Sequence, residues 1–282
     1  MTPLRPGVHH VPVTGGDLVV EVLAGTTAPV LAVHGISSTR RLWDWLRLQA
    51  PELTLVAPDL RGRGDSTGVA GPSSVHRHAE DLLAVLDALE LDTVVVCGMS
   101  MGAFVAVDLA VDHPDRVQSL VLVDGGFPMA TPPGLSRESL PAVFADRLDR
   151  LDRTWTSLDE YAAFFTEHTA PLLTDDAVLR GYLAHDLAEG RVRLSGPALL
   201  ADAESVFFGT PRWQELTVPV RFTHAEWGAG EDSPPAYPPD AAQEYGAAAV
   251  ATRFLPGLDY AGAVMTVTGA AATAELLREA LA

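Results

Sequence analysis

The sequence predicts an α/β fold in which helices flank a mostly parallel central sheet. Short apolar runs alternate with segments of helical periodicity over residues 30–123, and the alternation returns after residue 216. Between these two parts, the chain shows helix-like segments and no strand pattern. A chain of 282 residues, of which 48% are hydrophobic, is long enough to form one such domain with a large core and a helical insertion.

The first part of the chain is expected to begin with a hairpin and to continue as strands alternating with helices. Wholly apolar runs are typical of strands that are buried on both faces, and apolar positions three and four residues apart are typical of helices. The expected strands are residues 8–13, 18–22, 30–33, 53–57, 93–97 and 117–123, and the expected helices are residues 41–48, 75–91 and 101–111.

The later part of the chain predicts a helical cap followed by the end of the sheet. Proline-rich joins at Pro132-Pro133, Pro171 and Pro211 flank the helical segments. We expect a core domain of residues 1–126 and 216–282 and a cap of residues 127–215. The expected cap helices are 140–151, 158–168, 175–187 and 197–208; then come a strand (218–223), a loop (225–239), a strand (251–255) and a helix (264–281).

Composition excludes several classes of function. Acidic residues outnumber basic ones 37 to 19, and the net charge of -18 disfavours nucleic acid and anionic membrane surfaces as partners. The chain has no lysine and one cysteine, Cys97, which leaves no Schiff-base lysine and no disulfide. No metal-ligand or dinucleotide motif is present, so neither a metal nor a cofactor is expected. Without an evident signal peptide or membrane span, the sequence predicts a soluble cytoplasmic protein.

One motif carries chemistry: Gly98-Met99-Ser100-Met101-Gly102. It follows an expected strand and opens an expected helix, which is the setting in which a G-x-S-x-G sequence forms a nucleophile elbow. The glycines permit a tight reversal, and the helix N-terminus favours negative charge that develops beside the serine oxygen. The sequence therefore predicts that Ser100 is a nucleophile.

With this motif the chain resembles the α/β-hydrolase family over nearly its whole length, because further motifs follow in the family's order. His34-Gly35-Ile36 looks like the family's His-Gly loop. The resemblance implies that the backbone N–H groups of Ile36 and Met101 form an oxyanion hole beside Ser100. It also implies an α/β-hydrolase fold with a cap.

Residues 59–66, with the sequence DLRGRGDS, are similar to the family's loop after the fourth strand. That loop is a structural signature. We expect its charged side chains to hold the loop in place and not to contact substrate.

The acid of the catalytic site has more than one candidate. In many family members the acid follows the strand expected at residues 218–223, but Gly228 stands where the aspartate would be. Lipase-like members keep the acid at the end of the preceding strand, where this chain has Asp124, and we favour Asp124. The carboxylates that remain open as substitutes are Glu226, Glu231 and Asp232.

The position of the general base departs from the family pattern. The loop after the last strand reads LPGLDYAG, and Tyr260 stands where the resemblance implies a histidine. With a reference pKa of about 10, tyrosine is almost fully protonated at neutral pH and can hardly accept the serine proton. Loss of a triad base typically lowers the rate on the order of a thousandfold.

Three explanations of Tyr260 stay open. The histidine of a working serine hydrolase has been replaced in this chain, or the protein is non-hydrolytic and Tyr260 serves as a proton donor or polar clamp. In the third, another histidine has taken over the role. The histidines that the topology could bring near Ser100 are His168, His185 and His224.

The expected pocket lies between the elbow and the cap. We expect His34, Gly35, Met99 and Trp43 to line it, together with aromatic side chains of the cap. The sequence thus predicts a serine hydrolase acting on a carboxylic ester or lactone of a medium-sized, largely uncharged molecule, impaired by Tyr260. The alternative is a non-hydrolytic protein of the same fold, either ligand-binding or a lyase or cyclase in a biosynthetic pathway.

Overall fold

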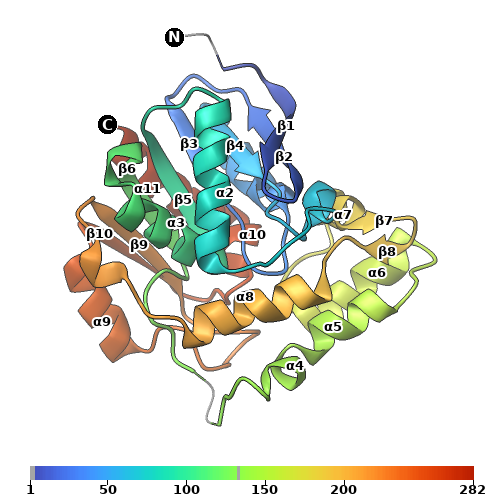
Figure 1. The fold of residues 1–282 in the computed structure, drawn as a ribbon. Helices are drawn as coiled ribbons and strands as arrows, with labels where there is room; N and C mark the ends of the chain where they lie inside the picture. The colour runs from blue at the N-terminus through green and yellow to red at the C-terminus, as the bar shows by residue number, and fades with distance from the viewer. Residues whose placement is uncertain (1–3, 132–133) are drawn as a thin grey trace.

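The computed structural model describes residues 4–131 and 134–282, and it shows an eight-stranded sheet with helices on both faces (Figure 1). The strand order is β1-β2-β4-β3-β5-β6-β9-β10. Strands β1 and β2 are antiparallel to their neighbours, and the strands from β4 to β10 pair in parallel. The bounds are β1 (Gly7–Val13), β2 (Gly16–Leu23), β3 (Pro29–Val33), β4 (Thr54–Pro58), β5 (Val94–Met99), β6 (Val117–Val123), β9 (Val220–Ala225) and β10 (Ala251–Leu255).

Helices cover the two faces of this sheet in separate layers. Helices α2 (Val75–Ala88), α3 (Met101–Asp112) and α9 (Pro239–Ala248) contribute to the core on one face, and α1 (Asp44–Gln49), α10 (Gly262–Met265) and α11 (Val267–Leu281) to the core on the other. Helix α2 shows why these segments are helical. Its buried Leu82, Val85 and Leu86 lie on one face, and the Ser74 hydroxyl accepts the N–H of Arg77 at 3.1 Å as an N-cap.

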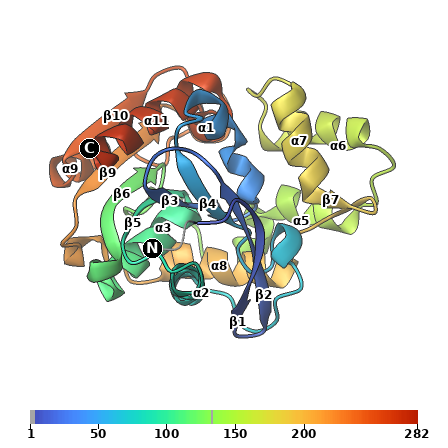
Figure 2. The same ribbon diagram turned by 90° about the horizontal axis from the view of Figure 1, so that it is seen from above.

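The helical insertion lies between β6 and β9. Figure 2 shows α5, α6 and α7 to one side of the sheet, and α8 runs from this group to contact α2 and α3. The expected α/β fold with a helical insertion is therefore confirmed. The boundaries at residues 127 and 215 stay a prediction, and the Pro132-Pro133 join lies outside the described residues. The bounds are α4 (Leu140–Val143), α5 (Ala145–Asp152), α6 (Leu158–Phe164), the π-helical turn η4 (Phe165–Thr169), α7 (Ala177–Asp186) and α8 (Gly196–Phe208).

The remaining short elements are four turns of 3-10 helix and one small hairpin. The 3-10 turns are η1 (Arg40–Trp43), η2 (Gly64–Ser66), η3 (Pro114–Arg116) and η5 (Trp213–Glu215). The hairpin, β7 (Leu187–Ala188) with β8 (Arg191–Val192), corrects the expectation that the insertion has no strands. Its turn uses Glu189 and Gly190 at φ values of 52° and 75°, and strands of two residues are too short to show an alternating pattern.

Two helices near the C-terminus also differ from the expectation. Helix α9 was not anticipated, because its alanine-rich sequence gives few large apolar side chains from which to recognise a period. The final helix is divided at Thr266, which has an extended backbone and whose hydroxyl accepts the N–H of Gly269 at 3.1 Å. This N-cap starts α11 as a separate helix.

The closeness of α3 to β3 provides a test of the packing around Ser100. A Cβ atom on Gly102 would lie 2.1 Å from the Val33 carbonyl oxygen, whereas a Cβ atom on Gly181 in α7 would meet nothing within 4 Å. We expect Gly102→Ala to lower the free energy of unfolding by about 1–3 kcal/mol or more. Gly181→Ala should raise it by about 0.5–1 kcal/mol because alanine favours the helix. Urea unfolding of both variants measures this, and equal effects would contradict it.

Candidate active site

Ser100 occupies a strained turn between β5 and α3. Its backbone has φ 55° and ψ −122°, a conformation that residues other than glycine rarely adopt. Neighbouring glycines make room for the turn: a Cβ atom on Gly98 would lie 2.3 Å from the Gly102 carbonyl oxygen, and one on Gly125 would lie 2.3 Å from the Ser100 carbonyl oxygen. The strand-turn-helix geometry expected of a nucleophile elbow is thus present.

The Ser100 side chain opens into a cavity of about 590 Å³ between the sheet and the insertion. Of the predicted site residues, Gly35, Ile36, Met99, Met101 and Tyr260 line this cavity with Ser100. The insertion contributes large side chains, and the β9–α9 loop closes another side. These further lining residues include Phe144, Arg147, Phe165, Tyr182, Val206, Phe207, Gly228, Ser233 and Pro234.

His34 orients the loop that is expected to supply one oxyanion amide. The His34 Nδ1–H donates to the Gly35 carbonyl oxygen at 2.8 Å, and the Leu60 N–H donates to His34 Nε2 at 3.0 Å, which requires the neutral Nδ1–H tautomer. Burial lowers the pKa of His34 to about 4, so the ring stays neutral. Because C=O and N–H point oppositely across a trans peptide, the Ile36 N–H points away from the His34 ring.

Arg63 fixes the other side of the same loop. Its Nε and Nη2 donate to the Ile36 carbonyl oxygen at 2.9 and 2.8 Å, and its Nη1 lies 2.6 Å from Asp202 of α8. Both side chains are fully buried. Arg63 Nη1 also donates to the Arg61 carbonyl oxygen at 2.9 Å, so the expectation that the charges of residues 59–66 hold that loop in place is confirmed for this arginine. The same side chain connects Ile36 to the insertion.

Tyr260 stands on a firmly held loop after β10. Its N–H donates to the Gly228 carbonyl oxygen at 2.9 Å, and the buried Asp259 carboxylate accepts the N–H groups of Gly262 at 2.8 Å and Gly230 at 3.2 Å. Burial raises the pKa of Tyr260 to about 12, although interaction with the Ser100 side chain lowers it. The phenol is therefore protonated at neutral pH, and it stands next to Ser100.

Asp124 lies at the end of β6, behind the cavity wall. Its φ is 46°, its N–H donates to the Thr223 carbonyl oxygen at 2.8 Å, and only 2% of its surface is exposed. Burial raises the pKa of Asp124 to about 8, against a lowering contact with the Ala225 backbone, and the Asp259 carboxylate raises it further. When it is ionised, Asp124 raises the pKa of Tyr260, so the two groups lie within range of electrostatic interaction.

Two predicted pocket residues do not line the cavity. His34 is fully buried, with both ring nitrogens engaged by the backbone, as described above. Trp43 is also fully buried and belongs to the core on the α1 and α11 face of the sheet, which continues into the insertion. Both predictions were wrong for the same reason: position near the motif in sequence does not reveal which side chains turn into the core.

The other histidines that the sequence left open also lie elsewhere. His168 is exposed and packs on Phe164 at 4.6 Å between ring centroids, and His185 Nε2 lies 3.2 Å from Asp59. His224 packs against Phe222. Among the described residues, no histidine lines the cavity of Ser100.

The alternative acids are placed away from the cavity as well. The Glu226 carboxylate accepts the N–H of Gly257 at 2.7 Å and so holds the turn before Tyr260. Glu231 and Asp232 are exposed. Asp124 is therefore the candidate acid that the fold brings next to Tyr260.

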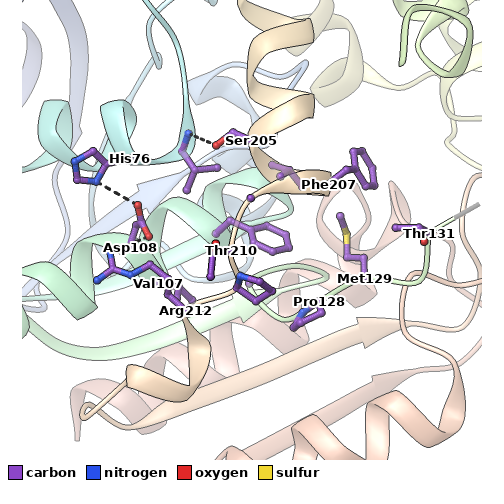
Figure 3. A pocket seen from close by; sticks show the side chains of 16 residues that line it. His76, Val107, Asp108, Pro128, Met129, Thr131, Ser205, Phe207, Thr210 and Arg212 are labelled. Atoms are coloured by element: carbon purple, nitrogen blue, oxygen red, sulfur yellow. Dashed lines mark hydrogen bonds and ion pairs between the residues drawn. The ribbon is translucent and has the colours of Figure 1, made fainter. Parts of the chain in front are cut away.

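A second hollow of about 480 Å³ lies beside the first and shares Met129 and Phe207 with it (Figure 3). At its far end His76, Asp108 and Asp112 come close enough together to suggest a cation site. Arg212 pairs with Asp108 at 3.2 Å and with Asp112 at 2.8 Å. The arginine already supplies the positive charge that these carboxylates need, so the group is explained as an ion-pair cluster.

Sequence reasoning missed two residues of the site. Arg147 lines the cavity from α5, a short helix whose sequence ADRLDRLD does not reveal which charged side chain faces inward. Asp259 did offer a signal, because a carboxylate three residues before a helical N–H is a capping pattern, and Gly262 begins α10.

A serine on a strained strand-to-helix turn, beneath a helical insertion, defines the α/β-hydrolase class of fold. The sequence pattern of the alpha/beta hydrolase family matches residues 30–275, and the chain belongs to this family.

Similar proteins include Lipase LipV of Mycobacterium tuberculosis (strain ATCC 25618 / H37Rv), 35% identical over 175 residues, which are 61% of this chain and 64% of the lipase. The match thus spans slightly under two thirds of that relative. A putative 2-succinyl-6-hydroxy-2,4-cyclohexadiene-1-carboxylate synthase of Bacillus subtilis (strain 168) is 27% identical over 70% of this chain and 73% of its own. Among solved structures, an E-2-(acetamidomethylene)succinate hydrolase has a TM-score of 0.77 at 20% identity, covering 96% of this chain and 97% of that one.

A thermophilic esterase from Thermogutta terrifontis, solved with malate bound, has a TM-score of 0.69 at 23% identity over 98% of this chain and 99% of that one. At these identities, the structural matches establish the fold. In the described part of the chain, no helix combines the length and the apolar character needed to cross a bilayer.

The buried carboxyl of Asp124 predicts a pH dependence of stability. Between pH 4 and 8 the folded protein holds a proton that the unfolded chain has lost, so the free energy of unfolding falls as the pH rises. Asp124→Asn removes this slope. We expect the variant to match the parent near pH 5 and to be more stable by about 4 kcal/mol near pH 9, because the parent loses about 1.4 kcal/mol for each pH unit between 5 and about 8. Urea unfolding at each pH measures this difference.

Asp92→Asn, which changes an exposed carboxylate, is the matched control and should leave the slope of the parent unchanged. An Asp124→Asn protein that loses stability between pH 5 and 9 as steeply as the parent would show that Asp124 does not hold the proton.

Proposed function

We propose that the chain is a Ser100-dependent hydrolase acting on a carboxylic ester or lactone of a medium-sized, largely apolar molecule. The observation that supports this proposal is the position of Ser100 itself: a strained elbow that presents the hydroxyl to a cavity of about 590 Å³ lined mainly by apolar side chains. The relatives and structural neighbours include proteins named as a lipase and as esterases, which agrees with this class of reaction.

In the proposed reaction the Ser100 oxygen attacks the substrate carbonyl carbon. The developing oxyanion accepts hydrogen bonds from the N–H groups of Ile36 and Met101, the latter being at the N-terminus of α3. The alkoxide or alcohol then leaves, and water hydrolyses the acyl-enzyme. Each half of the reaction needs a base, and this is where Tyr260 restricts the rate.

Tyr260 and Asp124 are both protonated at neutral pH, since their pKa values are raised to about 12 and about 8. Neither can accept the Ser100 proton efficiently there. Above pH 8 the Asp124 carboxylate forms, and it can take up a proton that Tyr260 passes on from Ser100. Turnover by the unaltered chain is therefore proposed to be slow.

A second candidate is a lyase, cyclase or binding protein of the same fold in which Tyr260 donates a proton or hydrogen bond. The raised pKa of Tyr260 favours it, because a buried phenol that stays protonated is a donor over the whole physiological range. The Bacillus subtilis relative is named as a putative synthase, which gives this candidate a precedent in the family.

The protonation states of the site predict how the hydrolysis rate of the unaltered enzyme depends on pH. We expect Ser100-dependent hydrolysis of p-nitrophenyl acetate to rise with pH through about 8, approaching tenfold per pH unit below it, as Asp124 ionises. Asp124→Asn should abolish that rise. After subtraction of the rate of Ser100→Ala, a profile that is flat from pH 6 to 9 would contradict the role of Asp124.

Restoring the family's base tests the proposal directly. A neutral imidazole in Tyr260→His can accept the Ser100 proton, and the resulting imidazolium stabilises the adjacent Asp124 carboxylate. We expect p-nitrophenyl ester hydrolysis at pH 7.5 to increase on the order of a hundredfold or more.

The control for this gain is the double variant Ser100→Ala/Tyr260→His, which should show no increase. Labelling of Ser100 by a fluorophosphonate should also become faster in Tyr260→His. If Tyr260→His leaves both hydrolysis and labelling unchanged while melting like the parent, the hydrolase proposal fails and the second candidate is favoured.

A further inference from the structure

The cavity of Ser100 contains one charged group. Among its described lining residues, Arg147 is the only side chain that carries a formal charge at neutral pH. It comes from α5 in the insertion and is half-buried. The charge therefore faces a largely apolar space, although an apolar substrate would not need it.

Arg147 differs from Arg150, the next arginine of α5, in having no acidic partner among the described residues. Within the part of the chain that the structure describes, no carboxylate lies within 4 Å of its guanidinium, and its recorded contact is with the Phe144 ring at 5.7 Å. Arg150, three residues later on α5, pairs with Asp186 at 3.6 Å and donates to the Ser37 carbonyl oxygen at 2.9 Å. The other described arginines without a carboxylate partner are exposed: Arg5, Arg47, Arg153 and Arg191.

A half-buried guanidinium without a counter-ion is costly, and an anionic ligand would offset that cost. Arg147, Tyr260 and Ser100 line the same cavity, and the charge of Arg147 lowers the pKa of Tyr260, so the guanidinium lies within electrostatic range of the phenol. The whole chain carries a net charge of -18, so a ligand anion would find little attraction to the protein apart from this positive group.

We infer that Arg147 binds a carboxylate of the substrate, so that the molecule attacked at Ser100 is an ester or lactone of a dicarboxylic acid with its second carboxylate free. The guanidinium fork matches the two carboxylate oxygens. The inference rests on the proposed function for the reacting carbonyl. It changes the expectation of a largely uncharged substrate to that of a substrate with one free carboxylate. The apolar lining then contacts the carbon chain between the two ends.

Binding to the Ser100→Ala protein tests the inference without requiring turnover. The probes are monomethyl glutarate, which carries one carboxylate and one ester, and dimethyl glutarate, which is neutral and of nearly the same size. We expect the monoanion to bind at least about tenfold more tightly by isothermal titration calorimetry. Adding Arg147→Gln should remove this preference, and Arg147→Lys should retain part of it.

Arg153→Gln is the matched control, because Arg153 is an exposed arginine of the same insertion that packs on Phe164 at 4.7 Å and does not line the cavity. It should leave the preference unchanged. Each variant is judged by the ratio of its affinities for the two probes. A variant that loses its fold would bind neither probe, and its melting curve would identify it. If Arg147→Gln does not fold, Arg147→Lys is compared with the parent in its place.

Three outcomes would overturn the inference: equal affinity for the two probes, a preference that survives Arg147→Gln in a folded protein, or binding of neither probe by folded Ser100→Ala. These outcomes are separate from failure of the proposed function. If Tyr260→His hydrolyses no ester but the monoanion preference depends on Arg147, the carboxylate site stands and the reaction is of another kind.

Discussion

The site depends on a backbone reversal that the surrounding packing must hold in a strained conformation. Ser100 has a positive φ, and the turn exists because Gly98, Gly102 and Gly125 leave space where a Cβ atom would overlap backbone oxygens. Parallel strands bring their carboxyl ends to one edge of the sheet, so the same packing places Asp124 and Tyr260 beside the turn. Strain at one residue is thus stabilised by the core of the whole sheet.

The chemistry that this arrangement permits is limited by where the protons reside. Ser100, Tyr260 and Asp124 form a chain of groups that all hold their protons at neutral pH, because burial favours the neutral form of both the phenol and the carboxyl. A histidine at position 260 would change the balance, since a cationic ring next to Asp124 stabilises its charge. In the proposed mechanism, the side chain at position 260 therefore decides whether the site favours proton transfer away from Ser100 or hydrogen-bond donation to a ligand.

The insertion does more than cover the cavity. Asp202 on α8 pairs with Arg63, whose guanidinium holds the Ile36 carbonyl, and Arg150 on α5 holds the Ser37 carbonyl. Movement of the insertion would therefore be transmitted to residues 36–37, the loop that is proposed to supply an oxyanion amide. The insertion also contributes Arg147, so under the proposed mode of binding it would influence both the reacting end and the recognition of the far end of a substrate.

The sequence by itself determined the alternation of strands and helices, the elbow at Ser100 and the tyrosine at position 260, because these are local patterns of period, glycine spacing and motif. Tertiary structure decided which side chains enter the cavity. Trp43 and His34 turn into the core, while Arg147, from another segment, lines the cavity of Ser100. The hairpin β7–β8 and helix α9 were likewise set by packing. The direction in which a side chain points depends on contacts between residues far apart in the chain, and a local sequence pattern contains no information about those contacts.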